Sequence, residues 1–421
     1  MAKFMIIVPP LTGHINPTVA LGQRLIALGH HVIWVGYKES LSASLPKYCE
    51  RRLLDKEAFS EHSTRRVDQH GAQERRGFAG LHYLWESVLI PLAQGSFTTL
   101  ERLLSEERPT LCIVDQQMLS GALVCQKWGY PYVSSATTSA ALIDALEGLP
   151  QIQSWHDQLL AALWSEFNVP RPSYQRLIEL SPLGTIAFSS KRMTLSVMGD
   201  HALDHLHSPV FFVGPALEGE RAPIDFPWHL LDLNLPKLFF SMGTVNAQRA
   251  APLYSRVIAA LSELNVQVIA AAPPKYFINA PHHWIIRERV PQLELLAHMD
   301  AVFCHGGHNT TMEALCFGLP LVIAPIRDDQ PVIAEQVKAI GAGLRVHFTR
   351  AKPESLRLAV EKVLFSAEIK RQAQAIRKEF ARHSESDFCQ DSNCKPVQIP
   401  AQLGAYQGSV IISKILEEIK S

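Results

Sequence analysis

One histidine and one carboxylate stand where they could share a proton. His14 follows the apolar segment Lys3–Val8 on a turn that contains Gly13, and Asp115 ends the apolar segment Leu111–Val114. Histidine can take up a proton near neutral pH, and a carboxylate that accepts its other ring N–H fixes the tautomer and stabilises the imidazolium. The spacing therefore indicates a general base, His14, with Asp115 as its partner. A loop histidine and a helix N-cap at Asp115 would give the same pattern.

A glycine-containing segment, residues 305–309 (HGGHN), lies between the apolar run Ala301–Cys304 and a helical pattern. Glycines let backbone N–H groups approach a ligand closely, and the N-terminus of a helix favours an anion. The segment therefore predicts a phosphate-binding loop. Local structural roles stay open, because Thr310 and Glu313 also fit a capping box and His305 also fits a hydrogen-bonded group at a strand end.

A third polar loop, residues 327–330 (RDDQ), precedes Pro331 and follows the apolar run Leu321–Ala324. Asp329 could simply be a helix N-cap with Pro331 in the first turn. However, this loop and the HGGHN loop follow consecutive strands. We therefore expect both loops to open at the same edge of one sheet.

Short β-branched runs that alternate with helical patterns supply the sheets that would position these loops. The pattern begins at Lys3 and starts again at Lys237, after the Pro-rich stretch Gly214–Pro236. We predict an α/β protein of two Rossmann-like, doubly wound domains that face each other across a cleft. The predicted parts are residues 1–215, a linker at 216–236, a second domain at 237–400 and a C-terminal helix within 401–421 that could pack back on the first domain.

Composition limits the alternatives. The 421 residues include 40 Lys or Arg and 40 Asp or Glu, and this balance argues against a surface that binds nucleic acid. No apolar run approaches the roughly 18 residues of a membrane-spanning helix, and the N-terminus lacks the features of a signal peptide. The seven cysteines are scattered and odd in number, which indicates a reduced, cytoplasmic protein without disulfides. Neither G-x-G-x-x-G nor a P-loop lysine follows the first strand of either domain, which disfavours dinucleotide oxidoreductases and P-loop enzymes.

Taken together, these residues resemble the family of UDP-sugar-dependent glycosyltransferases with the two-domain GT-B fold. The resemblance extends over the whole chain and is most specific between Val290 and Gln336, VPQLELLAHMDAVFCHGGHNTTMEALCFGLPLVIAPIRDDQPVIAEQ. This stretch is similar to the donor-sugar signature of the family, roughly W-x-P-Q…H-x-G-x-N-S/T-x-x-E…D/E-Q. Within this family, the sequence most resembles bacterial enzymes that glycosylate macrolides, polyphenols and other natural products, including antibiotics.

The resemblance implies a role for each matching position. His14 matches the catalytic base and Asp115 its partner; Val290 and Gln292 match the uracil contacts, and Glu313 matches the ribose contact. The remaining matches are the diphosphate loop (His305, Gly307, Asn309 and Thr310), the pair that holds the sugar hydroxyls (Asp329 and Gln330) and a loop that faces the phosphates (Ser241, Gly243 and Thr244).

The resemblance also implies the reaction: inverting, metal-independent transfer of a hexose, glucose in the first instance, from a UDP-sugar to a hydroxylated small molecule. Neither a resident cofactor nor a metal is expected, and we expect a monomer or weak dimer. One departure concerns the nucleotide, because Arg289 stands where the family has an aromatic residue that stacks on uracil, so a dTDP-sugar donor stays an alternative. A second is the segment Cys389–Ala401, which has no counterpart in the family.

Other functions stay open. A UDP-sugar epimerase of the same fold would need no acceptor, and a non-catalytic auxiliary protein would be expected to lack His14 and Asp115. A glycosyltransferase for lipid or carotenoid acceptors would need an apolar or basic patch. A basic patch could be formed by Arg65, Arg66, Arg75 and Arg76. The acceptor itself is expected in the aromatic-rich stretch His82–Trp164, although most of its large side chains could equally be core.

Overall fold

The structure is a computed structural model that describes residues 1–55, 78–142, 149–171, 180–197, 203, 208–217, 224–243, 248–382 and 403–420. The chain forms two compact units. Unit 1 comprises residues 1–189, 200–220 and 402–421, and unit 2 comprises residues 190–199 and 221–401. This division differs from the predicted one at residues 190–199, which are grouped with unit 2. The expected linker is divided between the two units.

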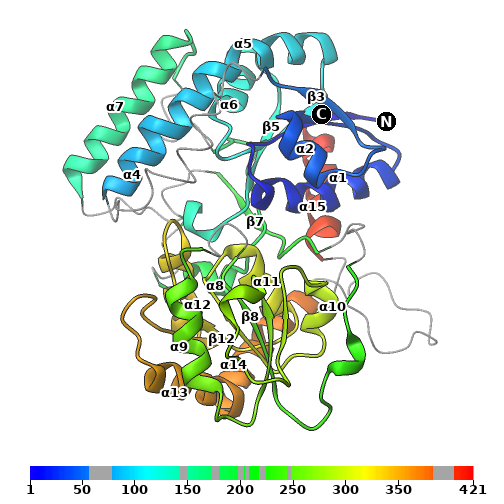
Figure 1. Cartoon of the computed structure of the whole chain (residues 1–421). Helices are drawn as coiled ribbons and strands as arrows, with labels where there is room; N and C mark the ends of the chain where they lie inside the picture. Colours follow the sequence, from blue (N-terminus) through cyan, green and yellow to red (C-terminus); the bar gives the residue numbers. More distant parts are fainter. Residues whose placement is uncertain are drawn as a thin grey trace. The chain divides into compact units, whose positions relative to one another are not determined.

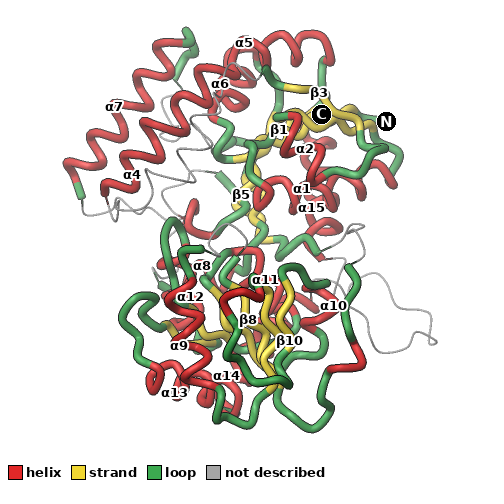
Figure 2. Tube along the Cα trace, viewed as in Figure 1, coloured by secondary structure: helices red, strands yellow, loops and turns green. Residues whose placement is uncertain are grey.

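The sheet of unit 1 is parallel and has the strand order β3-β2-β1-β4-β5-β6-β7. Figure 2 shows the strands in yellow and the helices around them in red. Its strands are β1 (Lys3–Ile7), β2 (His31–Gly36), β3 (Glu50–Leu53), β4 (Leu111–Asp115), β5 (Tyr132–Ala136), β6 (Thr185–Ala187) and β7 (Val210–Phe212). Ile7 pairs with Val114, and Asp115 pairs with Ser135. The carboxyl ends of β1, β4 and β5 therefore lie side by side at one edge of the sheet.

Helices cover both faces of this sheet. Phe4 and Ile6 of β1 point into one apolar core, together with side chains of α1 (Thr12–Ala27) and α15 (Leu403–Lys420). Met5 and Ile7 point into the other core, with α5 (Ile90–Glu107) and α6 (Leu119–Trp128). The alternation follows from the two-residue period of a strand. The other helical segments of unit 1 are α2 (Lys38–Ser44), α4 (Phe78–Leu84), η2 (Trp85–Leu89), η3 (Ser139–Leu142) and α7 (Pro150–Glu166).

The last helix, α15, packs on the first domain. A Cβ added to Gly404 would lie 2.7 Å from the main chain of Pro215, and one added to Gly408 would lie 3.0 Å from Leu21 of α1. Glycine at both positions lets the helix approach this closely, so the end of the chain is part of the core of unit 1.

Helices α4 and α7 run side by side in unit 1 (Figure 1). The rings of His82 and Trp155 stack with centroids 3.9 Å apart, and the indole of Trp155 donates a hydrogen bond of 3.0 Å to Glu86. The π-helical turn η2 lies directly before Pro91, which has no N–H to donate and cannot continue a regular α-helix without disruption.

Unit 2 repeats the design with a six-stranded parallel sheet of order β10-β9-β8-β11-β12-β13. The strands are β8 (Lys237–Ser241), β9 (Gln267–Ala271), β10 (Ile285–Arg287), β11 (Ala301–Cys304), β12 (Leu321–Ile323) and β13 (Gly343–Arg345). The helices are α8 (Lys191–Leu195), α9 (Ala251–Leu261), α10 (Gln292–Leu296), α11 (His308–Cys316), α12 (Gln330–Ala339), α13 (Pro353–Phe365) and α14 (Ala367–Arg382), with short 3-10 turns η5 (Trp228–Leu230) and η6 (Pro274–Tyr276). The two sheets confirm the predicted α/β class with two parallel-sheet, Rossmann-like domains.

Helix α1 differs from the sequence prediction, because it begins at Thr12 and so contains Gly13 and His14, which were expected on a turn. Helix α15 lies within the range 401–421 that was predicted for a C-terminal helix. Among the described residues, no helix combines the length and apolar character that a membrane span requires.

Candidate functional site

The first group of predicted residues lies in unit 1, at the carboxyl ends of its central strands. His14 occupies the first turn of α1, directly after β1, and Asp115 is the last residue of β4. Nδ1 of His14 lies 3.0 Å from both carboxylate oxygens of Asp115. The Asp115 side chain is fully buried, and that of His14 is 14% exposed. The structure thus brings the predicted pair together.

Asp115 is not the N-cap of the next helix. Helix α6 has Met118 as its N-cap, and the additional contact of Asp115 is the backbone N–H of Gln117, which donates to Oδ1 at 2.9 Å. One carboxylate oxygen thus holds the local turn, while both oxygens face the imidazole. The N-cap alternative is therefore wrong for this residue.

The geometry also fixes the tautomer of His14. A lone pair on Nδ1 would face the lone pairs of a buried carboxylate at 3.0 Å, which is repulsive. In the neutral ring, Nδ1 therefore carries the hydrogen, and Nε2 carries the lone pair. This is the arrangement of a histidine that removes a proton through Nε2.

A third side chain contacts the same ring nitrogen and was not predicted. Thr137 follows β5, and its Oγ1 lies 2.9 Å from Nδ1 of His14. The signal that found Asp115, a polar residue at the end of a strand, also applies to Thr137, but it does not separate Thr137 from the neighbouring Ser135, Thr138 and Ser139.

Most large side chains of the expected acceptor region are core. Trp85, Phe97 and Trp164 are at most 7% exposed, whereas Trp155 is only partly buried. Leu146 lies outside the described residues, as do Arg65, Arg66, Arg75 and Arg76. Trp85, Phe97 and Trp164 therefore belong to a core of unit 1, as the alternative reading of this stretch predicted.

The second group lies in unit 2, around the loop between β11 and α11. Gly306 has a φ of 86°, and Gly307 is the N-cap of α11, whose first N–H groups have no partner within the helix. A Cβ added to Gly307 would lie 2.6 Å from the imidazole of His305, and one added to Gly243 would lie 2.9 Å from it. The two glycines thus form a slot for the His305 ring and bring the loop after β8 against the loop after β11.

Burial lowers the pKa of His305, and its hydrogen bond with the backbone of Ser241 and the nearby Asp329 carboxylate offset only part of this shift. The ring is therefore neutral at neutral pH. Its Nδ1 is buried without a hydrogen-bond partner among the described residues. At neutral pH, an anion here can be attracted by the N-terminus of α11 and by the nearby guanidinium of Arg327, whose charge also lowers the pKa of His305.

Gln292, Thr310 and Glu313 meet where α10 packs on α11. The amide of Gln292 donates to Oε2 of Glu313 and lies 3.5 Å from Oγ1 of Thr310. Because α11 begins at His308, Thr310 lies inside the first turn and cannot be its N-cap. The capping-box alternative for Thr310 and Glu313 is therefore wrong. Glu313 is a buried carboxylate, 6% exposed.

Asp329 and Gln330 lie between β12 and α12, next to the HGGHN loop. Asp329 occupies the N-cap position of α12 but makes no capping hydrogen bond. Oε1 of Gln330 accepts the backbone N–H groups of Ile326 and Arg327 at 2.9 and 3.1 Å. The carbonyl end of Gln330 thus holds its own loop, and its amide NH₂ has no hydrogen-bond partner among the described residues.

Three further residues that were singled out from the sequence are described by their burial or their position. Val290 is buried, Arg289 is exposed, and Asn309 lies in the first turn of α11. Thr244 lies outside the described residues, as does the segment Cys389–Ala401.

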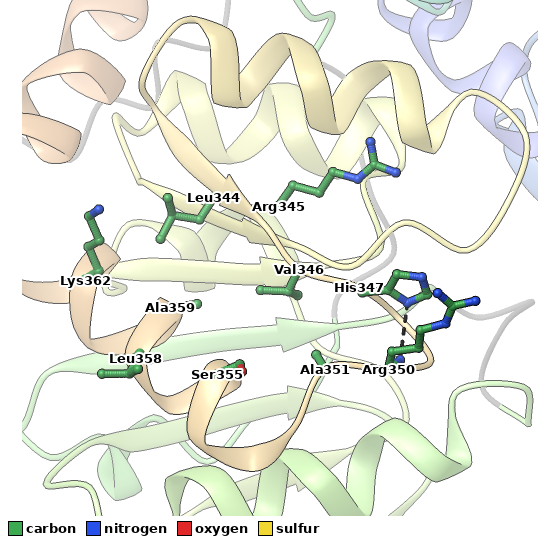
Figure 3. A pocket seen from close by; sticks show the side chains of 10 residues that line it. All are labelled: Leu344, Arg345, Val346, His347, Arg350, Ala351, Ser355, Leu358, Ala359 and Lys362. Atoms are coloured by element: carbon green, nitrogen blue, oxygen red, sulfur yellow. Dashed lines mark hydrogen bonds between the residues drawn. The ribbon is translucent and has the colours of Figure 1, made fainter.

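A surface pocket of about 460 Å³ lies elsewhere in unit 2, between helix α13 and the stretch formed by β13 and the residues after it (Figure 3). Its lining consists of Leu344, Arg345, Val346, His347, Arg350, Ala351, Ser355, Leu358, Ala359 and Lys362. None of the predicted site residues is among them, and Arg345 is paired with Glu335 at 2.6 Å. We assign no part of the site to this pocket.

Known proteins share this architecture. Residues 255–387 match the family model of the erythromycin biosynthesis protein CIII-like C-terminal domain. The chain is 30% identical to the NDP-glycosyltransferase YjiC of Bacillus subtilis over 372 residues, which cover 86% of this chain and 88% of that protein. It is 24% identical to the uncharacterized UDP-glucosyltransferase YojK of the same species, over 96% and 99% of the two chains.

A solved structure of similar fold is the glycotransferase of kitacinnamycin. It superposes with a TM-score of 0.75 at 19% identity and covers 98% of both chains. The fold and the relatives agree: the chain belongs to the GT-B family of NDP-glycosyltransferases and is an enzyme of the natural-product type.

Proposed function

We propose that this enzyme transfers a hexose, glucose in the first instance, from a UDP-sugar to a hydroxyl group of a small apolar or phenolic natural product, with inversion and without a metal. The observation that carries the proposal is the contact of His14 with the buried carboxylate of Asp115. The name of the UDP-glucosyltransferase relative supports the choice of donor.

In this mechanism, Nε2 of His14 removes the proton of the acceptor hydroxyl while the oxygen attacks the anomeric carbon. The new C–O bond forms as the bond to the diphosphate breaks, and UDP leaves with the electron pair. Asp115 stabilises the imidazolium through Nδ1–H. A single displacement inverts the anomeric configuration.

Unit 2 supplies the donor contacts. The N-terminus of α11 meets the growing negative charge of the diphosphate, together with the loop Ser241–Gly243. His305 can contact a diphosphate oxygen through Nδ1 once that nitrogen has taken up a proton. Glu313 holds the ribose, Val290 and Gln292 hold the base, and Asp329 with the amide of Gln330 holds the sugar hydroxyls. These roles follow the family pattern.

The test measures UDP release from UDP-glucose with and without a panel of phenolic and macrolide acceptors. We expect release only when an acceptor is present. Release or isomerisation of the sugar without any acceptor would favour an epimerase or hydrolase instead. Calorimetric titration with UDP and dTDP decides the nucleotide, which is open because Arg289 replaces the expected aromatic residue.

The matched variant is His14→Ala. We expect turnover to fall by about 10²- to 10⁴-fold, the usual contribution of a general base, while UDP binds as in the wild type. His347→Ala, which removes an exposed histidine of unit 2, is the control and should leave turnover unchanged. Full activity of His14→Ala would remove His14 from the mechanism.

A further inference from the structure

The hydrogen on Nδ1 of His14 faces three oxygen atoms, and one of them belongs to no predicted site residue. Oγ1 of Thr137 lies 2.9 Å from Nδ1, as close as the two oxygens of Asp115 at 3.0 Å. Thr137 is only 4% exposed. Among the described residues, its hydroxyl makes this one hydrogen-bond contact.

The fold places the three residues on separate elements. His14 lies on α1, Asp115 ends β4, and Thr137 follows β5. Asp115 pairs with Ser135, and Thr137 stands two residues further on, which corresponds to the same face of the sheet. Two adjacent strands thus each direct one polar side chain towards the same ring nitrogen.

The chemistry of the contact is set by Asp115. Because the carboxylate requires a hydrogen on Nδ1, the Thr137 oxygen must accept from that N–H rather than donate to it. The Nδ1–H is then shared between a carboxylate and a hydroxyl. The two oxygens of Asp115 are equally distant from Nδ1, so the imidazole ring could rotate slightly to favour either one. A third oxygen, from Thr137 on another strand, restricts this rotation.

We propose that Thr137 is a positioning residue for the base: it fixes the ring plane of His14, so that the Nε2 lone pair has one direction. Threonine suits this role because its branched Cβ restricts χ1 and so holds Oγ1 in place. The inference deepens the proposed function, since it matters for turnover only if His14 is the base.

The test compares Thr137→Val, which keeps the shape and removes the hydroxyl, with Thr137→Ser, which restores the hydroxyl. Each variant is assayed with a phenol and with the thiophenol of the same ring, whose thiol is ionised at the assay pH and needs no base. We expect Thr137→Val to lower kcat/KM for the phenol by about five- to tenfold, the range of one neutral hydrogen bond. Turnover of the thiophenol should change little, and Thr137→Ser should recover most of the loss.

Thr185→Val is the matched control. Thr185 is buried in β6 of the same unit, and its hydroxyl has no hydrogen-bond partner among the described residues. It should therefore leave both reactions unchanged. An equal loss with phenol and thiophenol in Thr137→Val, no loss with either, or weaker UDP binding would overturn the positioning role.

A measurement that needs no turnover separates this inference from the proposed function. In protein labelled with ¹⁵N-histidine, the Nδ1–H resonance of His14 is assigned by its absence in His14→Ala. We expect this hydrogen to exchange with water several-fold faster in Thr137→Val and at nearly the wild-type rate in Thr137→Ser. Unchanged exchange in Thr137→Val would overturn the inference. Full activity of His14→Ala would instead overturn the proposed function, whatever the exchange rate.

Discussion

The side chains that we propose for the chemistry of this enzyme lie at strand ends, and most of them were singled out from the sequence. His14 and Asp115 could be predicted because each directly follows an apolar run, and parallel strands bring such positions to one edge. Thr137 could not be singled out in the same way. Its environment in the sequence, Ser-Ala-Thr-Thr-Ser, offers several hydroxyls, and only the register of β4 with β5 selects the one that contacts His14.

At the scale of residues, a substitution of Glu313 tests the proposed binding of the nucleotide donor. Glu313→Ala removes a buried carboxylate that accepts from Gln292, and in the proposed function it also removes the ribose contact. We expect UDP affinity to fall by about 10- to 100-fold, the value of hydrogen bonds to a charged group. Calorimetric titration measures it. Glu294→Ala, which removes an exposed carboxylate on α10, is the control. If Glu313→Ala lowers only the melting temperature, the carboxylate serves packing and not the nucleotide.

At the scale of elements, most central strands could be predicted and edge strands could not. β1, β4, β11 and β12 coincide with the predicted apolar runs to within two residues at either end, and β8 begins at Lys237, where the pattern was predicted to start again. The edge strands β3, β7, β10 and β13 were missed, and so was the interior strand β6, whose three residues are too few to form an apolar run. β3 has the sequence ERRL and no buried residue, and β13 has one buried residue in three. Because an edge strand is covered on fewer sides, its sequence lacks the apolar run on which the prediction relies. Gly13 and His14 were expected on a turn, because glycine disfavours a helix locally, but they form the first turn of α1, where the packed setting tolerates glycine.

The close packing of the His305 ring against Gly307 provides a testable prediction at the scale of elements. Gly307 has an ordinary φ of −60°, so Gly307→Ala meets no backbone strain, but the new Cβ would lie 2.6 Å from the His305 ring. We expect the free energy of unfolding to fall by about 1 to 3 kcal/mol, as in other overpacked sites, and UDP binding to weaken. In a His305→Ala background the clash is gone, and the same substitution should cost much less. Chemical denaturation of the four proteins of this cycle measures the difference. An equal cost in both backgrounds would mean that the ring is not the obstacle.

At the scale of the whole molecule, each unit separates stability from chemistry along its sheet. The site residues follow the carboxyl ends of the strands, whereas polar networks join the amino ends. In unit 1, Glu107 accepts from Lys3 at 3.1 Å and from Arg52 at 2.6 Å, and Arg52 also pairs with Glu50. In unit 2, the backbone N–H of Lys237 donates to Asp300 at 2.8 Å, and Gln267 donates to the carbonyl groups of Leu230 and His283. Substitutions at the amino ends should therefore affect unfolding without altering the site.

The network of unit 1 makes this separation testable through pH. Burial of Glu107 opposes ionisation, but the hydrogen bonds from Lys3 and Arg52 outweigh it and lower the pKa of Glu107. The hydrogen bond from His31, with that from Arg52, lowers the pKa of Glu50 against a smaller effect of burial. A carboxylate with a lowered folded-state pKa binds fewer protons in the folded than in the unfolded protein. Its stabilisation is therefore complete above the unfolded pKa, near 4.5, and is lost as the pH falls through the lowered folded value.

Glu107→Gln should accordingly destabilise unit 1 at pH 7 by about 1 to 3 kcal/mol, the range for hydrogen bonds to a charged group, and the difference from the wild type should shrink below about pH 4. Urea unfolding at both pH values measures this difference. The transition that belongs to unit 1 is the one to monitor, because two units need not unfold together.

Glu106→Gln, on the same helix, is the control, because it removes an exposed i,i+4 pair with Arg102 and should cost little at either pH. UDP binding and turnover at pH 7 should stay at the wild-type level in Glu107→Gln, since the network joins the strand ends opposite to His14. A pH-independent cost would assign Glu107 to packing, and a loss of turnover in the folded variant would contradict the separation of stability from chemistry.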